Sequence, residues 1–185
     1  MKQLADTIRK VLPAVIKEVN EIRIPALEQA WGRSFKEELA NEDQVTVEIS
    51  KNYNRVLNNT LFRHVSNVLK DFREHTTNGS DYILGDVLIE DKNSFSDSGG
   101  WVGNGFDKTP IHLLKKFKCD ADGRIREAFV CIVDLSKCKS KWSDRSINTN
   151  RSVISFDNED LKNIEVVYGE IKTNRVKLKP IMKPV

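Results

Sequence analysis

The spacing of apolar residues changes near residue 80, and this change limits the possible folds more than any other feature of the sequence. Before it, apolar residues recur every three or four positions, as they do along one side of an α-helix. After it, they come in short runs separated by turn residues, as they do in β-strands. We therefore expect a helical part over residues 1–77 and a sheet-containing part over residues 78–185.

The N-terminal part is predicted to contain three amphipathic helices. They cover residues 2–24, a stretch from Pro25 to about Leu39, and residues 52–75. Pro13 lies inside the first helix and is expected to kink or split it, because proline removes a backbone hydrogen bond.

The C-terminal part is predicted to alternate between strands and short helices. Its expected elements are a hairpin at residues 82–84 and 87–89, a helix from Thr109 to about Lys118, a turn at 120–123, a strand from Glu127 to Leu135, a strand at 152–156, a short helix at 157–162, and strands at 164–168 and 175–178. The chain's 185 residues, 39% of them apolar, are enough for one compact domain. This order predicts a single α/β domain in which helices flank a mixed sheet.

Composition excludes several classes of protein. No apolar stretch approaches the roughly 18 residues that span a bilayer, and closely spaced charges near the N-terminus are incompatible with a secretory signal. We therefore expect a cytoplasmic protein. The three cysteines, Cys119, Cys131 and Cys138, have no CxxC spacing, which predicts reduced thiols and no structural zinc site.

Basic residues are concentrated in one segment, although the net charge of the chain is only +3. The segment 137–151 holds five lysines and arginines against a single acid. Its candidate contacts to DNA phosphates are Lys137, Lys139, Lys141 and Arg145, with Trp142 as a stacking or packing residue. Lys108, which precedes this segment, is a further candidate for DNA contact.

Three charged residues lie at the open end of the expected hairpin. Alternate residues of a strand share a face, so Glu90 and Lys92 point the same way. The hairpin brings Asp81, at the start of its first strand, across from the end of the second. Two carboxylates suit a hard cation such as Mg²⁺, and a nearby lysine orients water and offsets developing negative charge. Such a set is typical of phosphodiester hydrolysis.

This segment resembles the PD-(D/E)xK nuclease superfamily, which includes most type II restriction endonucleases. The resemblance covers the hairpin and the β-β-α-β order over residues 78–135. It implies a restriction-endonuclease-like core and a Mg²⁺-dependent DNA endonuclease. Asp81 matches the first acid, Glu90 the second acid and Lys92 the lysine, and the backbone carbonyl of Asp91 is a further expected metal ligand.

The motif has rivals within the chain. The family's proline before the first acid is Ser80 here, which leaves Asp86 as an alternative to Asp81. We prefer Asp81, because Asp86 would lie at the far end of the hairpin from Glu90. The acid-x-lysine pattern also occurs at Asp160–Lys162 and Glu170–Lys172. The first of these lies in an expected helical turn, and too little chain follows the second to complete the fold. A third acid from the N-terminal part, Asp71 or Glu74, stays open.

A glycine-rich loop, Gly99–Gly105, follows the hairpin and precedes Lys108. Its glycines would let the backbone approach a phosphate, and the helix expected at Thr109 would direct its N-terminus to the same place. The alternative is a surface loop anchored by Trp101.

One active site of this type cuts one strand of double-stranded DNA. We find no helix-turn-helix, zinc finger or separate reading domain in the sequence. The chain is therefore similar to the small catalytic subunit of a heterodimeric type IIS enzyme, in which a larger subunit recognises the DNA. The alternatives are a homodimeric type II enzyme, a repair or recombination nuclease, and a non-catalytic DNA-binding or protein-interaction module on the same fold.

Overall fold

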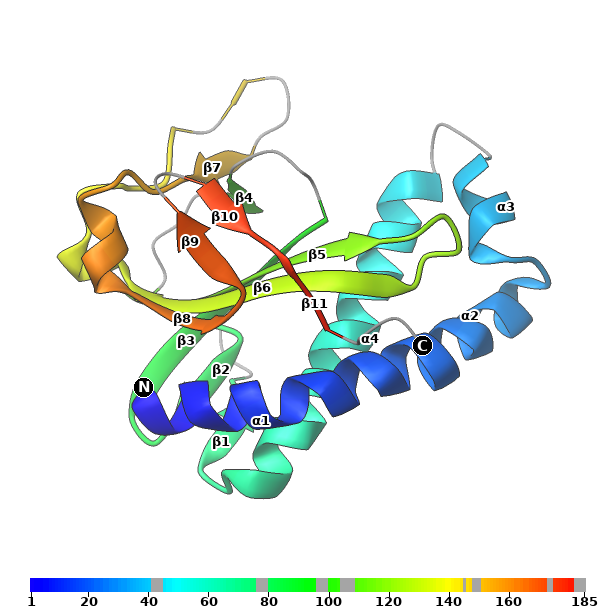
Figure 1. Ribbon diagram of the computed structural model, residues 1–185, viewed down its shortest axis with the longest axis horizontal. Coiled ribbons are helices and arrows are strands. Elements are labelled where there is room, and N and C mark those ends of the chain that lie inside the picture. Colours follow the sequence, from blue (N-terminus) through cyan, green and yellow to red (C-terminus); the bar gives the residue numbers. More distant parts are fainter. Residues whose placement is uncertain are drawn as a thin grey trace.

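The computed structural model describes residues 1–40, 45–75, 80–95, 100–103, 109–144, 146–147, 151–172 and 175–181. Their arrangement is mixed α/β with a helical N-terminal third, which confirms the predicted fold class (Figure 1). The helical elements of this third are α1 (Lys2–Glu18), the π-helix η1 (Val19–Arg23), α2 (Ile24–Trp31), α3 (Phe35–Ala40) and α4 (Val45–Val68). Among the described helices, none has both the length and the apolar character needed to cross a membrane.

The first helix passes through Pro13 and continues through η1 into α2 (Figure 1). The expected split at Pro13 is therefore wrong. Pro13 lies on the exposed side of α1, where water can bond the carbonyl group that a proline leaves free. The irregular turn comes later, at Val19–Arg23, and is followed by Pro25, which has no N–H to donate, in the first turn of α2.

The helix predicted over residues 52–75 is longer at its start and shorter at its end. It begins at Val45 and ends at Val68, and residues Phe72–Glu74 form strand β1. Phe72 continues the helical spacing of apolar residues, but it packs against Tyr82 of the neighbouring strand, with ring centroids 5.0 Å apart. The pairing of two strands therefore replaces the last expected turn of the helix.

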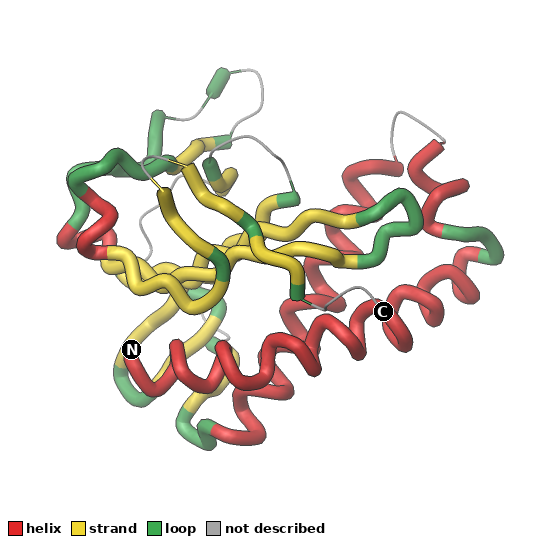
Figure 2. Tube along the Cα trace, viewed as in Figure 1, coloured by secondary structure: helices red, strands yellow, loops and turns green. Residues whose placement is uncertain are grey.

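Within the described residues, a seven-stranded sheet forms the centre of the molecule (Figure 2). Its strands are β1, β2 (Tyr82–Leu84), β3 (Val87–Ser94), β5 (Ile111–Cys119), β6 (Ile125–Asp134), β8 (Ile164–Tyr168) and β11 (Lys179–Pro180). The predicted hairpin is confirmed as β2 and β3, and Gly85 takes the positive φ of 60° that its tight turn requires. Strand β3 then pairs in parallel with β5, which pairs antiparallel with β6.

The smaller elements mostly match their predictions. Two short sheets join β4 (Trp101–Gly103) to β7 (Ser152–Ile154) and β9 (Glu170–Lys172) to β10 (Arg175–Lys177), and two 3₁₀ turns are η2 (Leu135–Lys137) and η3 (Asp160–Asn163). The strands expected at 152–156, 164–168 and 175–178 are thus confirmed with small changes of bounds. The short helix expected at 157–162 is the turn η3.

The helix predicted from Thr109 to Lys118 is wrong, because residues 111–119 form strand β5. Ile111, Leu113 and Phe117 face the helices, whereas Leu114 faces the opposite side of the sheet. Both faces of β5 are buried, so its sequence lacks the polar alternation of a half-exposed strand. Consequently, the β-β-α-β order on which the family resemblance partly rested is not the order seen in the described residues.

The two faces of the sheet are covered by different layers. Helices α1 and α4 cover one face, which we call the helix face, and their buried side chains pack on Ile89, Leu113 and Val130 (Figure 1). The other face, the loop face, is covered by β4, β7 and the segments around them, with Trp101 at the centre of its cluster. The three cysteines are free thiols, and Cys131 is fully buried in this cluster, as predicted.

Candidate active site

The hairpin fixes the backbone on both sides of the candidate site. The N–H of Asp81 donates to the carbonyl oxygen of Ile89 at 3.0 Å, and its own carbonyl oxygen accepts from the N–H of His75 at 3.0 Å. Asp81 is thus held between β1 and β3, directly before β2. Glu90 and Lys92 project from β3 toward the loop face, because residues two apart share a face.

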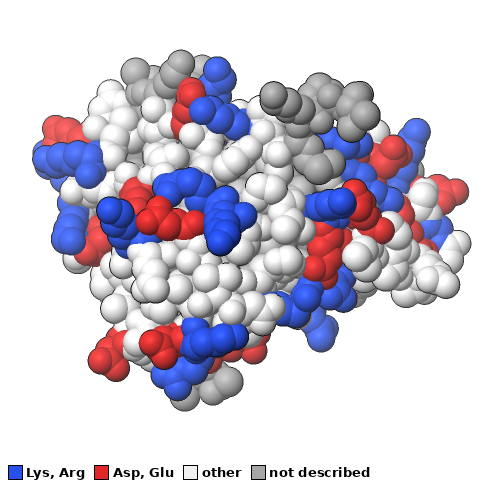
Figure 3. All heavy atoms as spheres, turned by 60° about the horizontal axis from the view of Figure 1, so that its bottom comes forward, with Lys and Arg blue, Asp and Glu red and all other residues white. Residues whose placement is uncertain are grey.

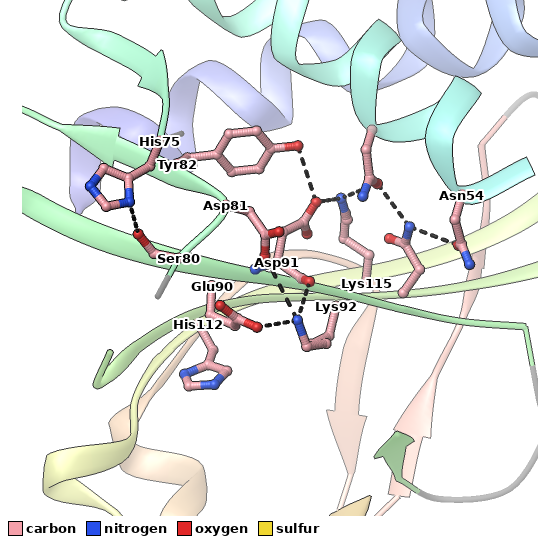
Figure 4. A network of polar contacts seen from close by, with 12 residues as sticks. Asn54, His75, Ser80, Asp81, Tyr82, Glu90, Asp91, Lys92, His112 and Lys115 are labelled. Atoms are coloured by element: carbon pink, nitrogen blue, oxygen red, sulfur yellow. Dashed lines mark hydrogen bonds and ion pairs between the residues drawn. The ribbon is translucent and has the colours of Figure 1, made fainter. Parts of the chain in front are cut away.

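The predicted residues meet around one ammonium group (Figure 4). Lys92 Nζ donates to the carbonyl oxygen of Asp91 at 2.9 Å, forms an ion pair with Glu90 Oε1, and lies 3.7 Å from Asp81 Oδ2. The same Asp81 oxygen accepts a hydrogen bond from the backbone N–H of Asp91 at 2.7 Å. The structure therefore brings together Asp81, Glu90, Lys92 and the Asp91 carbonyl.

Exposure rises across the site from one acid to the other. The Glu90 side chain is 9% exposed, that of Lys92 is 20% exposed and that of Asp81 is 46% exposed. Glu90 is therefore seated in the sheet, while Asp81 faces solvent. A ligand can reach the oxygens from the Asp81 side, and the buried side restricts how far Glu90 can move.

The oxygens around Lys92 fit a hard divalent cation in their chemistry. Two carboxylates and one carbonyl converge on a positive charge, and Mg²⁺ characteristically takes one or two carboxylates while keeping waters or substrate phosphates. Across the part of the chain that the structure describes, no three His, Cys, Asp or Glu side chains form a ready metal-binding group. A cation at this site would therefore depend on water and a phosphate for its remaining ligands.

A second lysine–carboxylate pair lies on the opposite face of the same strand (Figure 4). Asp91 Oδ2 accepts from Lys115 Nζ at 2.6 Å and from the Tyr82 hydroxyl at 3.2 Å, and the side chains of the ion pair are fully buried. Burial raises the pKa of Asp91 and lowers the pKa of Lys115, and their mutual attraction opposes both shifts.

Among its described side chains, helix α4 adds asparagines to this buried network and no acid. Lys115 Nζ donates to Asn58 Oδ1 at 3.0 Å, and Asn93 Nδ2 donates to Asn58 and Asn54 at 2.8 and 2.9 Å. The sequence offers two acids as a third site residue, Asp71 and Glu74. Glu74 is paired with Tyr82, whose side chain lies on the helix face, and Asp71 lies in the turn before β1. Neither acid therefore shares the loop face with Glu90.

His112 lies beside the site, in a place that the sequence did not indicate. It is paired with Glu90 in the parallel register of β3 and β5 and is 1% exposed. Its Nε2 accepts from the Trp142 indole N–H at 3.3 Å. Trp142 also packs over Gly103, because a Cβ atom there would lie 2.9 Å from the indole and 3.4 Å from Lys92 Cε. The prediction of a helix at 109–118 concealed this neighbour of Glu90.

The candidate DNA-contacting residues are partly described. Lys139 is exposed and forms an ion pair with Glu159, and Lys141 Nζ donates to the Leu135 carbonyl at 2.7 Å. Lys108 and Arg145 lie outside the described residues, as do Gly99 and Gly105 of the loop 99–105. Trp101 is buried and donates to the Lys115 carbonyl at 2.8 Å, so it anchors this loop to β5. The phosphate site expected at a helix N-terminus near Thr109 is wrong, because β5 begins there.

The rival motifs occupy other environments. Asp160 is 1% exposed and accepts from the backbone N–H groups of Lys139 and Ser140, which makes it a loop-fixing residue. Glu170 pairs with Lys179 at 2.7 Å. Asp86 is exposed in the turn between β2 and β3, at the opposite end of the hairpin from Asp81. The geometry therefore favours Asp81 as the first acid.

Comparison with known proteins assigns this chain to no family. The sequence matches no protein-family model, and the search of curated proteins returned no significant match.

Proposed function

We propose that this protein is a Mg²⁺-dependent DNA endonuclease of the PD-(D/E)xK type, in which Asp81, Glu90 and Lys92 form the active site. The observation that carries the proposal is the convergence of Asp81 Oδ2, Glu90 Oε1 and the Asp91 carbonyl oxygen on the Lys92 ammonium group. Three oxygens from the hairpin already surround the Lys92 ammonium group, so these residues need little reorganisation to hold a metal cation.

The residues of the chain divide the chemistry between them. Asp81, Glu90 and the Asp91 carbonyl would hold the cation, which polarises a bound phosphate and lowers the pKa of its water. Lys92 would move from these oxygens toward the attacking water and the phosphate, orienting the first and offsetting the developing charge on the second. The exposed side of Asp81 leaves room for the DNA backbone to approach.

The basic segment supports DNA as the substrate. Trp142 lies within this segment and packs over Gly103 beside Lys92, so Lys139 and Lys141 belong to a segment that passes next to the site. The exposed pair of Lys139 with Glu159 can exchange for a phosphate at little cost. Over the face displayed in Figure 3, lysines and arginines are interspersed with acids, so this face offers DNA no positive field of one sign.

A single site of this kind would cut one strand. We therefore propose that a larger DNA-recognising subunit supplies sequence recognition and the second cut, with a second copy of this chain as the alternative. On this proposal the protein acts in the cytoplasm, and its free thiols are compatible with a reducing compartment.

The first test is cleavage of supercoiled plasmid DNA by the purified chain, alone and with a candidate partner subunit. We expect nicking with Mg²⁺, none with EDTA, and a loss of at least about 10²-fold in Glu90→Gln, a change that removes the charge and keeps the shape. Folding of the variant is checked by circular dichroism and thermal unfolding.

The outcomes separate the alternatives. Nicking that needs the partner supports the subunit role, and double-strand cleavage by the chain alone supports a homodimer. Magnesium-independent DNA binding without cleavage under every condition would instead assign a non-catalytic module. Wild-type activity in a well-folded Glu90→Gln variant would show that the site lies elsewhere.

A further inference from the structure

Asp91 stands between the two site residues of β3, but its side chain points away from them. The carboxylate lies on the helix face, where Lys115 Nζ and the Tyr82 hydroxyl hold its Oδ2 at 2.6 and 3.2 Å. Both side chains of the ion pair are completely buried. No part of this pair can touch DNA in the folded protein.

The backbone N–H and carbonyl groups of Asp91 form hydrogen bonds with the site residues Asp81 and Lys92. Its N–H donates to Asp81 Oδ2 at 2.7 Å, and its carbonyl oxygen accepts from Lys92 Nζ at 2.9 Å. A rotation or shift of this one residue would therefore displace an acid and the lysine of the site together. The buried side chain is the group that prevents such a shift.

Lys115 is itself fixed from several directions. Its Nζ also donates to Asn58 Oδ1 on α4 at 3.0 Å, and its carbonyl oxygen accepts from Trp101 Nε1 on β4 at 2.8 Å. The Lys115 ammonium group thus ties β3 to β5 and α4, while the bond from Trp101 fixes the Lys115 backbone to the loop strand β4. Hydrogen-bonded charges fix direction as well as distance, whereas apolar contacts between strands and helices tolerate small displacements.

We infer that Asp91 and Lys115 form a buried positioning pair that holds the Asp91 backbone in the orientation required by Asp81 and Lys92. Its catalytic consequence rests on the proposed nuclease function, but its geometric consequence does not. Lys115 is therefore a positioning residue for a site that it does not touch. Such supporting contacts around metal sites typically change affinity or activity by about 10- to 100-fold.

The decisive variant is the double change Asp91→Leu/Lys115→Met. It removes both charges at once, so no unpaired charge stays buried, and apolar replacements of this kind usually preserve folding. The matched control is Asn20→Leu. Asn20 makes two buried hydrogen bonds to the backbone of Ile125, at 2.9 and 2.8 Å, and lies in the helix η1 away from the site.

Three measurements are made under conditions in which every variant is folded. Amide hydrogen exchange at position 91 reports the bond to Asp81 without any activity. Calorimetric titration with Ca²⁺ reports cation affinity. Cleavage kinetics at saturating Mg²⁺ separate kcat from KM for DNA. For the double variant we expect amide exchange at position 91 to be at least about tenfold faster, Ca²⁺ binding and kcat to be about 10- to 100-fold lower, and KM for DNA to stay within about twofold.

The inference is overturned if the double variant folds and keeps wild-type exchange at position 91, Ca²⁺ affinity and kcat. It is equally overturned if Asn20→Leu changes these quantities by as much, because the effect would then be general destabilisation. If the double variant does not fold, Tyr82→Phe removes one donor to the same carboxylate oxygen and must accelerate exchange at position 91. A wild-type protein that neither binds Ca²⁺ nor cleaves DNA, alone or with the candidate partner subunit, would refute the nuclease proposal, and the exchange measurement would still decide the positioning role.

Discussion

Strand β3 contributes the carboxylate to two lysine–carboxylate pairs, one on each of its faces. The two pairs differ in exposure, in the origin of the lysine and in their neighbours. Lys92 and Glu90 lie on the loop face with side chains 20% and 9% exposed, whereas Lys115 and Asp91 are fully buried on the helix face. Lys92 reaches its partner within one strand, while Lys115 comes from the parallel neighbour β5. The lysine of the first pair also lies 3.7 Å from a carboxylate oxygen of Asp81, whose side chain is 46% exposed.

The difference teaches that charge and spacing alone do not identify the chemistry of a lysine. A buried ion pair gives up two hydration shells and must recover that cost by fixed geometry. A partly exposed pair keeps part of its hydration, so its carboxylate can exchange the lysine for a metal cation and its lysine can exchange the carboxylate for a phosphate. We therefore assign rigidity to the helix face and reactivity to the loop face, and the following variants test this division.

The largest effect is expected for Lys115→Met, measured as stability. The change leaves Asp91 buried with the Tyr82 hydroxyl as its remaining described donor, and breaking a buried pair in this way costs about 3–5 kcal/mol. Urea unfolding followed by circular dichroism measures the loss. Most of it should return in Asp91→Leu/Lys115→Met. A loss below about 1 kcal/mol would mean that the pair does not stiffen this face.

Lys92→Met should give the opposite profile. Removing a donor that acts on developing charge lowers cleavage by about 10²–10³-fold, while the 20% exposure of the Lys92 side chain keeps the loss of unfolding free energy below that of Lys115→Met. Plasmid nicking rates and urea unfolding of the same preparations measure the two quantities. The division between the faces fails if Lys92→Met is more destabilising than Lys115→Met.

A third charged cluster, formed by Glu18 of α1 with residues of η1 and α4, shows how a purely structural carboxylate should behave. Burial acts to raise the pKa of Glu18, but hydrogen bonds from His64, Arg63 and Arg23 outweigh it and lower the pKa to about 2. The folded value lies below the unfolded one near 4.5, so the stabilisation is complete above pH 4.5 and disappears as the pH falls toward 2.

Glu18→Gln should therefore destabilise the protein by about 2–3 kcal/mol at pH 7. The difference from the wild type should shrink steadily between pH 5 and about pH 2 in chemical denaturation. Glu21→Gln is the matched control, because Glu21 is 54% exposed and lies 4.0 Å from Lys17, and it should change stability by no more than about 0.5 kcal/mol. A pH-independent penalty at Glu18 would contradict the assigned cause.

The sequence predicted the local parts of this arrangement and missed its long-range parts. The hairpin follows from two apolar runs around Gly85, and Glu90 and Lys92 share a face because of the strand period, so both were predictable. The strand β5 was not, because Lys115 and Lys116 suggest a solvated helix. In the fold Lys115 meets Asp91, and Lys116 lies 5.7 Å from the centre of the Trp101 ring. Such partners become visible only once the parallel pairing of β3 and β5 is known.

The smallest effect is expected at Asp86, the alternative first acid. Asp86 lies in the turn of the hairpin, four residues before Glu90, and a strand rises about 3.3 Å per residue, so about 13 Å of strand separates them. Asp86→Asn should keep nicking within about twofold and stability within about 0.5 kcal/mol, as for most exposed substitutions. Asp81→Asn provides the contrast, because it removes charge from the oxygen that accepts the Asp91 N–H and lies near Lys92. If Asp86→Asn abolished nicking while Asp81→Asn did not, the first acid of the site would be Asp86 in the turn. The division between the two faces of β3 would then no longer describe the site.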